Sequence, residues 1–220
     1  MAFGIKLHCW GAWACFTRPE MKVERVSYDV ITPSAARGIL EAIYWKPEIR
    51  WRIDRLTVLN PIQFTSIRRN EVNEKISART AEQAMAAGTG NLGLYVDDTQ
   101  TRQQRAALLL RDVAYLIGAH FDVVTGEDNE AKHLDQFRRR ARRGQCYARP
   151  FFGCREFAAN FALIEDGGAS PCVHSALQGE RDLGWMLHDI DFSNNFQPVF
   201  FRATMRNGVV EVPRFEGARP

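Results

Sequence analysis

The chain has 220 residues, of which 45% are hydrophobic and 25% are charged, and its formal net charge is only +3. These values indicate a folded domain, and no apolar run approaches the ~18–20 residues of a membrane span. The five cysteines form no C-x-x-C pair, and phosphate-binding and zinc-protease motifs are absent from the sequence. We therefore expect no metal and no other cofactor. The start lacks a signal-peptide pattern, so we expect a cytoplasmic protein with reduced thiols that does not associate with a membrane.

The basic residues are unusually rich in arginine. Of the 29 basic residues, 5 are lysine and 24 are arginine. Arginine grips phosphate with a flat fork of five donors and stacks on bases, so the excess points to an anionic partner. Codon choice in a GC-rich genome explains the same excess, and composition alone does not separate the two interpretations.

The first elements are predicted from alternation and helix-boundary signals. Apolar residues alternate over residues 3–10 and predict a strand with one buried face. Thr32 and Pro33 predict the start of a helix that ends before Pro47. Residues 49–58 then predict a strand with a bulge at Asp54 and Arg55.

The middle of the chain is less regular. We expect residues 61–72 to be extended, and residues 73–91, which have no clear period, to form a long mobile loop. Residues 106–110 are compatible with a helix, whereas strict alternation over residues 113–123 predicts a strand.

A second helix is predicted over residues 127–143, followed by Gly144 at the C-cap. Its apolar stripe is expected to comprise Ala131, Leu134, Phe137 and Ala141, with His133 at the edge of the polar face. Further strands are predicted near residues 157–163, 183–192 and 199–205, and Asn207-Gly208 predicts a hairpin turn.

The order of elements predicts an α+β fold. Residues 1–148 fit a ferredoxin-like, RRM-like β-α-β-β-α-β domain. Residues 149–220 are expected to form a small C-terminal antiparallel β-sheet domain.

The second helix carries the clearest charge pattern. Its acids lie in the first half, and its second half holds Arg138, Arg139, Arg140, Arg142 and Arg143. This order complements the helix dipole, so a solvated helix is one interpretation. Five guanidinium groups within two turns repel one another unless an anion is near, so the alternative interpretation is an RNA-binding helix.

Arginines also gather in the first half of the chain. Arg50, Arg52 and Arg55 lie on the strand after the first helix, and Arg68-Arg69 follow. An open sheet face with arginine and aromatic side chains is a surface for unpaired RNA, although an ordinary solvent-facing strand has the same pattern. The candidate RNA-binding residues outside the second helix are Lys46, Arg50, Arg52, Arg68 and Arg69.

Lys132 and His133 stand beside the basic run, and Tyr44 closes the first helix. A histidine moves protons near pH 7, and an adjacent ammonium stabilises negative charge. Cleavage of RNA without a metal needs a group that takes the 2′-OH proton, a group that stabilises the phosphorane and a group that protonates the 5′-oxygen. An exposed histidine without a role and a tyrosine in the core are the simpler alternatives.

Residues 38–47, Gly-Ile-Leu-Glu-Ala-Ile-Tyr-Trp-Lys-Pro, resemble a signature of the CRISPR-associated RAMP proteins of type I-C systems, the subtype-d branch of Cas family five. Further stretches agree with this family in the same order: residues 61–62, 67–72, 119–121, 132–133, 153–157 and 183–187. The resemblance runs from about residue 3 to residue 213. Ala131 and Gly118 depart from the family pattern.

The resemblance implies a metal-independent endoribonuclease that cleaves CRISPR precursor RNA at the repeat hairpin. The protein would remain on the 5′ handle, beside the backbone and large subunits of the type I-C Cascade-like complex, in antiviral defence. The resemblance assigns catalysis to Tyr44, Lys132 and His133: Tyr44 activates or positions the 2′-OH, Lys132 stabilises the phosphorane and His133 is the general acid or base. Weak binding of double-stranded DNA is a further expectation.

Two alternatives remain open from the sequence. One is a non-catalytic subunit that only holds the 5′ handle, and the other is a general nucleic-acid-binding protein. Convergence of Tyr44, Lys132 and His133 on one basic cleft would favour cleavage. A buried Tyr44 far from His133 would favour binding alone.

Overall fold

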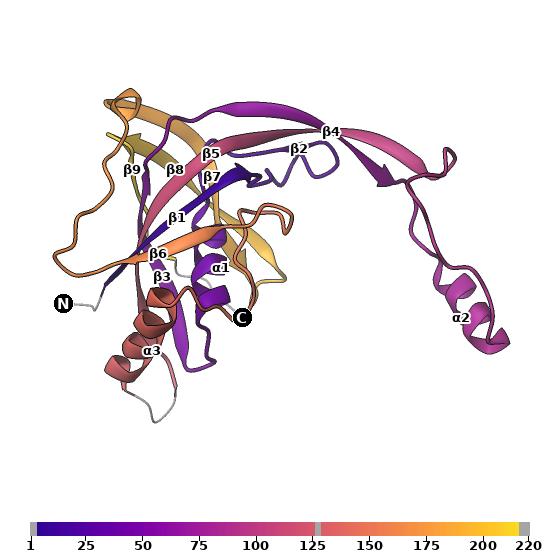
Figure 1. The fold of residues 1–220 in the computed structure, drawn as a ribbon, viewed down its shortest axis with the longest axis horizontal. Coiled ribbons are helices and arrows are strands. Elements are labelled where there is room, and N and C mark those ends of the chain that lie inside the picture. The colour runs from indigo at the N-terminus through magenta and orange to yellow at the C-terminus, as the bar shows by residue number, and fades with distance from the viewer. Residues whose placement is uncertain (1–3, 126–128, 216–220) are drawn as a thin grey trace.

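A computed structural model describes residues 4–125 and 129–215, in which one large sheet is combined with few helices (Figure 1). The α-helices are α1 (Pro33–Ile43), α2 (Ala78–Ala87) and α3 (Glu130–Arg142), and a short 3-10 turn covers Ser175–Leu177. The strands are β1 (Ile5–Ala14), β2 (Arg25–Val26), β3 (Ile49–Val58), β4 (Phe64–Val72), β5 (Arg102–Val123), β6 (Asn160–Ile164), β7 (Glu180–Asp191), β8 (Gln197–Arg206) and β9 (Val209–Glu211). No helix in the described part of the chain is both long and apolar enough to cross a membrane.

The strands follow the order β6-β1-β5-β3-β9-β8-β7, and β2 and β4 also pair with β5. The described pairings are antiparallel except for the parallel pair β2–β5. The second half of β5 pairs with β1 and β3, while its first half pairs with β4. The β4–β5 pair therefore extends away from the core, and α2 lies at its far end (Figure 1).

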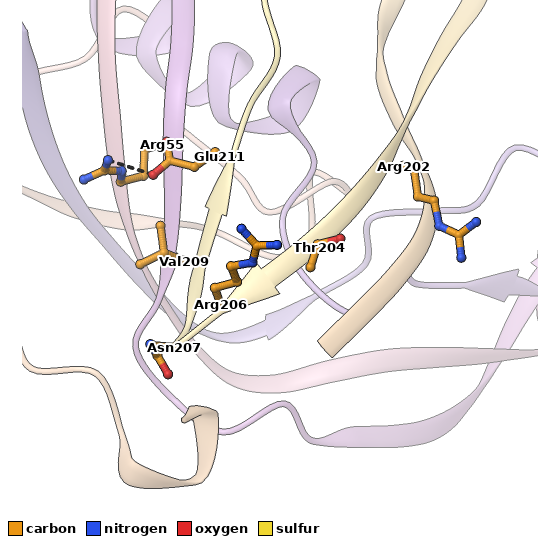
Figure 2. A pocket seen from close by; sticks show the side chains of 7 residues that line it. All are labelled: Arg55, Arg202, Thr204, Arg206, Asn207, Val209 and Glu211. Atoms are coloured by element: carbon orange, nitrogen blue, oxygen red, sulfur yellow. Dashed lines mark ion pairs between the residues drawn. The ribbon is translucent and has the colours of Figure 1, made fainter. Parts of the chain in front are cut away.

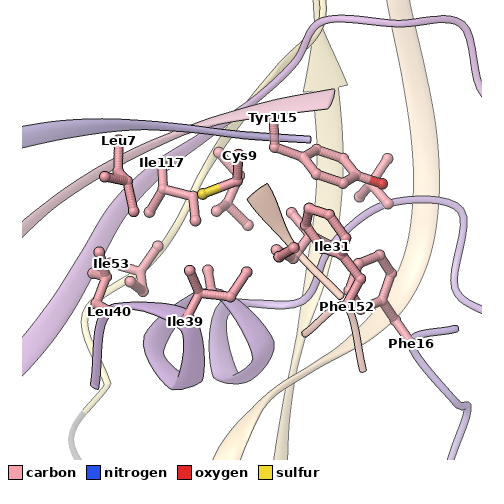
Figure 3. Packing of buried hydrophobic residues seen from close by; sticks show 14 of the residues in the cluster. Leu7, Cys9, Phe16, Ile31, Ile39, Leu40, Ile53, Tyr115, Ile117 and Phe152 are labelled. Atoms are coloured by element: carbon pink, nitrogen blue, oxygen red, sulfur yellow. The ribbon is translucent and has the colours of Figure 1, made fainter. Parts of the chain in front are cut away.

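The core lies between the sheet and the helices α1 and α3. Ile39 and Leu40 of α1 face Leu7, Cys9 and Ile117 of the sheet, and all five are buried (Figure 3). The helix α3 packs on β3 through Phe137, whose ring centroid is 4.8 Å from that of Trp51. These contacts fix the inner face of β3, so the alternate side chains Arg50 and Arg52 belong to the opposite face.

Several local predictions are confirmed. The Thr32 hydroxyl caps α1 by accepting a hydrogen bond from the Ala35 amide at 3.3 Å. The strand register shifts between Ile53 and Arg55, where a bulge was expected. The residues Asn207 and Gly208 have positive φ values of 49° and 79° and join β8 to β9.

Residues 73–91 were expected to be a loop, and this prediction is wrong because they contain α2. The Ser77 hydroxyl accepts from the Thr80 amide at 3.1 Å at the start of α2, and Gly88 ends it with a φ of 65°. None of the α2 residues is buried, so the helix has no apolar face that periodicity can detect.

The helix considered for residues 106–110 is also wrong, because these residues belong to β5. The adjacent residues Leu109 and Leu110 point to opposite faces of β5 and both are buried, so both faces are covered here, which explains an apolar run without alternation.

The predicted second helix is confirmed as α3, described from Glu130. Its proposed first residues, Glu127 and Asp128, lie outside the described residues. Gly144 follows the helix with a φ of 63°, as expected of a residue just past a helix end. The buried stripe differs from the prediction because His133 is buried and Ala131 is exposed.

A buried ion pair joins α1 to β7. The Arg37 guanidinium donates to both Asp189 carboxylate oxygens at 2.9 Å and to Glu41 at 2.8 Å. Burial alone would lower the pKa of Arg37, but Asp189 and Glu41 raise it above its usual value. Arg37 therefore stays charged and depends on its partners.

Replacing Asp189 is expected to destabilise the fold. Asp189→Ala leaves the buried Arg37 guanidinium with Glu41 alone, and loss of one partner of a buried pair costs about 3 kcal/mol or more. Chemical denaturation measures this cost. Asp166→Ala, which removes the exposed partner of Arg138, is the control and is expected to have a much smaller effect. Equal effects of the two variants would contradict the prediction.

Candidate active site

Tyr44 and His133 meet although 89 positions separate them in the sequence. The Tyr44 hydroxyl oxygen lies 2.9 Å from His133 Nδ1, within hydrogen-bond distance. The two residues are 4% and 1% exposed. The binding-only alternative expected a buried Tyr44 that lies far from His133. Tyr44 is buried, but it contacts His133.

The end of α1 positions Tyr44. Tyr44 has left the helix, with φ −151° and ψ 117°, and its carbonyl accepts a hydrogen bond from Trp51 Nε1 at 2.9 Å. The preceding carbonyls of Ala42 and Ile43 accept from the Tyr147 amide at 2.8 Å and from Arg140 Nη1 at 2.9 Å. Distant donors therefore satisfy the carbonyls that a helix end leaves without intrahelical partners.

The first turn of α3 positions His133. The Asn129 side chain caps this helix by accepting from the Lys132 amide at 2.9 Å. The imidazole packs edge-on against Phe121, with ring centroids 6.1 Å apart. His133 therefore takes a place in the buried face of α3, where Tyr44 supplies its polar partner.

Glu48 approaches the other side of the imidazole. Its Oε2 atom lies 3.5 Å from His133 Nε2, and this nitrogen has no hydrogen-bond partner among the described residues. The Glu48 side chain is 32% exposed, so the imidazole lies between the buried Tyr44 hydroxyl and a carboxylate near solvent. Glu48 was not among the site residues predicted from the sequence. Its one signal is an acid directly after the Tyr-Trp-Lys-Pro stretch.

Lys132 occupies the exposed side of the same turn as His133. It lines a pocket of about 480 Å³ with Asn129, Ala131, Asp135, Gln136 and Arg139. The structure therefore joins Tyr44 and His133 directly, whereas Lys132 neighbours His133 in the sequence and lies on the exposed side of the same turn.

The α3 arginines have protein partners. Arg138 pairs with Asp166 at 2.8 Å, and Arg142 pairs with Glu165 at 2.5 Å. The hydrogen bond from Arg142 lowers the pKa of Glu165. The carboxylates of Glu165 and Asp166, which follow β6, therefore offset part of the repulsion among the α3 arginines. An external anion is not needed to offset all of it.

The remaining α3 arginines differ in their surroundings. Arg139 donates to Gln136 at 2.6 Å, and Arg143 is exposed at the end of the helix. Arg140 is directed to the candidate site, because its guanidinium carbon lies 5.3 Å from the Tyr44 ring centroid. Arg140 contacts the aromatic face of Tyr44 in a cation–π geometry.

The other candidate RNA-binding residues do not form one cluster. Arg52 pairs with Asp122 at 2.7 Å and donates to the Phe215 carbonyl, while Arg50 is half-buried on the same face. On β4, Arg69 pairs with Glu156 and with Glu71, and Arg68 is exposed. Lys46 is exposed after α1.

Comparison with known proteins identifies similar CRISPR-associated proteins. A sequence profile described as CRISPR-associated protein, Cas5d, matches residues 4–213. A protein of Mannheimia succiniciproducens, named CRISPR pre-crRNA endoribonuclease Cas5d, is 54% identical over 220 residues, which cover 98% of this chain and 97% of that protein. A protein of the same name from Thermus thermophilus is 40% identical over 235 residues and covers 95% of this chain and 91% of that protein.

A solved structure of a CRISPR-associated protein has the same fold. Its TM-score is 0.69 at 24% sequence identity, and the match covers 97% of this chain and 93% of that chain. The resemblance found in the sequence is confirmed by the profile and by both relatives. The chain therefore belongs to the Cas5d family of CRISPR-associated proteins.

Proposed function

We propose that this chain cleaves CRISPR precursor RNA at the repeat hairpin without a metal ion. It then stays on the 5′ handle, in the cytoplasm, beside the backbone and large subunits of the type I-C Cascade-like complex. Two family members are named pre-crRNA endoribonucleases. The observation that carries the proposal is the 2.9 Å contact between Tyr44 and His133, the residues that the family resemblance assigns to catalysis.

In the proposed reaction, the ribose 2′-oxygen attacks the adjacent phosphorus and the bond to the 5′-oxygen breaks. His133 carries its proton on Nε2, toward Glu48, so Nδ1 accepts from the Tyr44 hydroxyl. This hydrogen bond makes the Tyr44 oxygen a better acceptor for the 2′-OH proton. Lys132 stabilises the phosphorane, and the proton reaches the 5′-oxygen from this pair or from water.

Burial of the pair sets a condition on this reaction. Tyr44 and His133 are 4% and 1% exposed, so RNA binding has to open the end of α1 or the first turn of α3. The same burial favours the non-catalytic handle-binding subunit as a second candidate function. Cleavage assays separate the two.

The basic residues proposed to contact RNA phosphates are Lys46, Arg50 and Arg52 of β3, Arg68 and Arg69 of β4, and Arg138, Arg139, Arg140, Arg142 and Arg143 in and after α3. Exposed ion pairs contribute little stability, so a phosphate backbone can replace the carboxylates of Glu165 and Asp166. These contacts are independent of sequence, and weak binding of double-stranded DNA follows from the same charge.

We also propose a ferredoxin-like arrangement around this site. Strands β1, β3, β5 and β6 with α1 and α3 follow the order β-α-β-β-α-β along the chain, and they lie side by side in the order β6-β1-β5-β3. This order supports the RAMP-type fold. The division into residues 1–148 and 149–220 stays a prediction, and β6 from the second segment pairs with β1.

Cleavage of the repeat RNA is expected to continue in excess EDTA, because the proposed reaction uses only side chains. The products are expected to carry a 2′,3′-cyclic phosphate and a 5′-hydroxyl, which end-labelling and phosphatase treatment identify. A scrambled hairpin is the control RNA and stays intact. A requirement for Mg²⁺ would contradict the mechanism, and binding without cleavage would leave the handle-binding function.

Tyr44→Phe is expected to lower the single-turnover cleavage rate by roughly 100-fold, the usual contribution of a general acid or base. This variant keeps the ring against Arg140 and loses only the hydroxyl that contacts His133. His133→Asn is expected to give a similar loss. The control is His120→Asn, which alters a histidine that contacts Asp54 outside the site and is expected to leave the rate unchanged. Unchanged rates in both site variants would contradict the proposal.

Glu48→Gln is expected to lower the rate about tenfold or more, because a neutral amide no longer stabilises a proton on His133 Nε2 through the negative charge of a carboxylate 3.5 Å away. RNA affinity and the thermal midpoint are expected to stay unchanged, and Glu48→Asp is expected to recover part of the rate. Asp54→Asn, at the matching His120 pair, is the control. If Glu48→Gln weakens RNA binding or lowers the thermal midpoint without changing the rate, Glu48 has no positioning role.

A further inference from the structure

A second basic site lies on strands β3, β8 and β9. Arg55, Arg202 and Arg206 line a pocket of about 590 Å³ (Figure 2). The other lining residues are Thr204, Asn207, Val209 and Glu211. This set, which we call the β8–β9 pocket, brings together three guanidinium groups, a hydroxyl, an amide and one carboxylate.

The β8–β9 pocket lies on the face of the sheet opposite α1 and α3. Arg55 follows the β3 bulge with a side chain that is 58% exposed, whereas the next residue, Leu56, is fully buried in the core, so the two point to opposite faces. On β8, Ala203 and Met205 are buried toward the core, so Arg202 and Arg206 point the other way. The pocket is therefore separate from the Tyr44–His133 pair, which lies on the helix-covered face.

The three arginines keep their charge accessible. Arg55 pairs with Glu211 at 2.7 Å, Arg202 with Asp182 at 2.6 Å and Arg206 with Glu180 at 3.0 Å. These arginine side chains are 58%, 66% and 73% exposed. Such exposed pairs contribute little stability, so a polyanion that contacts all three guanidinium groups can displace the carboxylates.

An exposed aromatic side chain adjoins the charge. Trp185 of β7 pairs in register with Arg202 and is 64% exposed. Phe200, 39% exposed, precedes Arg202 by two residues on the same face of β8. Exposed aromatics beside arginines suit a ligand that has both flat bases and phosphates, because bases stack on aromatic rings while arginine binds the backbone. An acidic protein surface matches the charge but leaves Trp185 without a stacking partner.

We propose that the β8–β9 pocket binds the phosphates of single-stranded RNA and that Trp185 stacks on an unpaired base. The identity of the polynucleotide as RNA rests on the proposed function. The pocket adds a contact remote from the reacting phosphate, and it recognises an unpaired stretch because a base in a duplex is not free to stack on Trp185.

Affinity measurements on the full chain test this proposal. Labelled repeat RNA with a single-stranded flank is titrated with protein at several salt concentrations, and anisotropy gives Kd. The double variant Arg202→Gln, Arg206→Gln is expected to raise Kd about tenfold or more and to reduce the salt slope by about 2. Trp185→Ala is expected to raise Kd about fivefold or more with an unchanged slope.

Matched controls lie outside the pocket. Arg181→Gln removes an arginine of β7 that is 52% exposed and pairs with Asp29, and Trp13→Ala removes a tryptophan of β1 that is 40% exposed. Both are expected to leave Kd within about twofold of the wild type, since neither lines the pocket. Cleavage by the pocket variants at saturating RNA is expected to proceed at the wild-type single-turnover rate.

The outcomes separate this proposal from the cleavage proposal. Unchanged affinity in the pocket variants, or an equal loss in the controls, overturns the RNA pocket and leaves an acidic protein surface as its ligand. If the wild type cleaves RNA and the pocket variants keep its affinity, the pocket proposal is wrong and the cleavage proposal stands. If the pocket variants lose affinity but the wild type does not cleave RNA, the pocket proposal is supported and the cleavage proposal is wrong.

Discussion

The buried C-terminal end of α1 is the constraint on which the candidate site depends. A helix end leaves carbonyl groups without intrahelical partners, and burying them without donors is costly. Here the carbonyls of Ala42, Ile43 and Tyr44 accept from the Tyr147 amide, Arg140 and Trp51 Nε1. These donors come from β3, α3 and the segment after α3, so they hold the parts of the chain that carry Tyr44, Glu48 and His133. The Tyr44–His133 contact is therefore a consequence of how the end of α1 is satisfied.

Electrostatics in this chain are local, and the small net charge of +3 conceals them. In α3 the acids that offset Arg138 and Arg142 are Asp166 and Glu165, which follow β6. Arg140 differs because its contacts are the Ile43 carbonyl and the Tyr44 ring. The arginine excess is consequently divided between exposed ion pairs, which a phosphate backbone can replace, and a guanidinium that stabilises the site itself. Codon bias accounts for neither of these placements.

The sequence predicted the elements whose signals are local. The Thr32 cap, the bulge at Arg55 and the Asn207-Gly208 turn depend on neighbouring residues alone, so the sequence contains their cause. The helix α2 was missed because it buries nothing and therefore has no apolar stripe, although its capping residues Ser77 and Gly88 were readable. Tyr44, Lys132 and His133 were candidates from their chemistry and were assigned to catalysis by the family resemblance, whereas periodicity placed His133 beside the polar face. Glu48 and the acid partners of α3 were missed because those contacts join segments that only the tertiary fold brings together.

Burial of the reactive pair has a consequence for selectivity under the proposed function. In a site of low dielectric constant the Tyr44–His133 hydrogen bond is stronger, but RNA cannot reach it until the surrounding contacts change. Arg140 belongs to the basic surface of α3 and also contacts both Tyr44 and the Ile43 carbonyl. A phosphate that draws Arg140 outward therefore removes a hydrogen bond from the end of α1 and a cation from the Tyr44 ring at the same time. Substrate binding and access to the pair are thereby coupled through one side chain, so RNA that does not engage α3 leaves the pair closed.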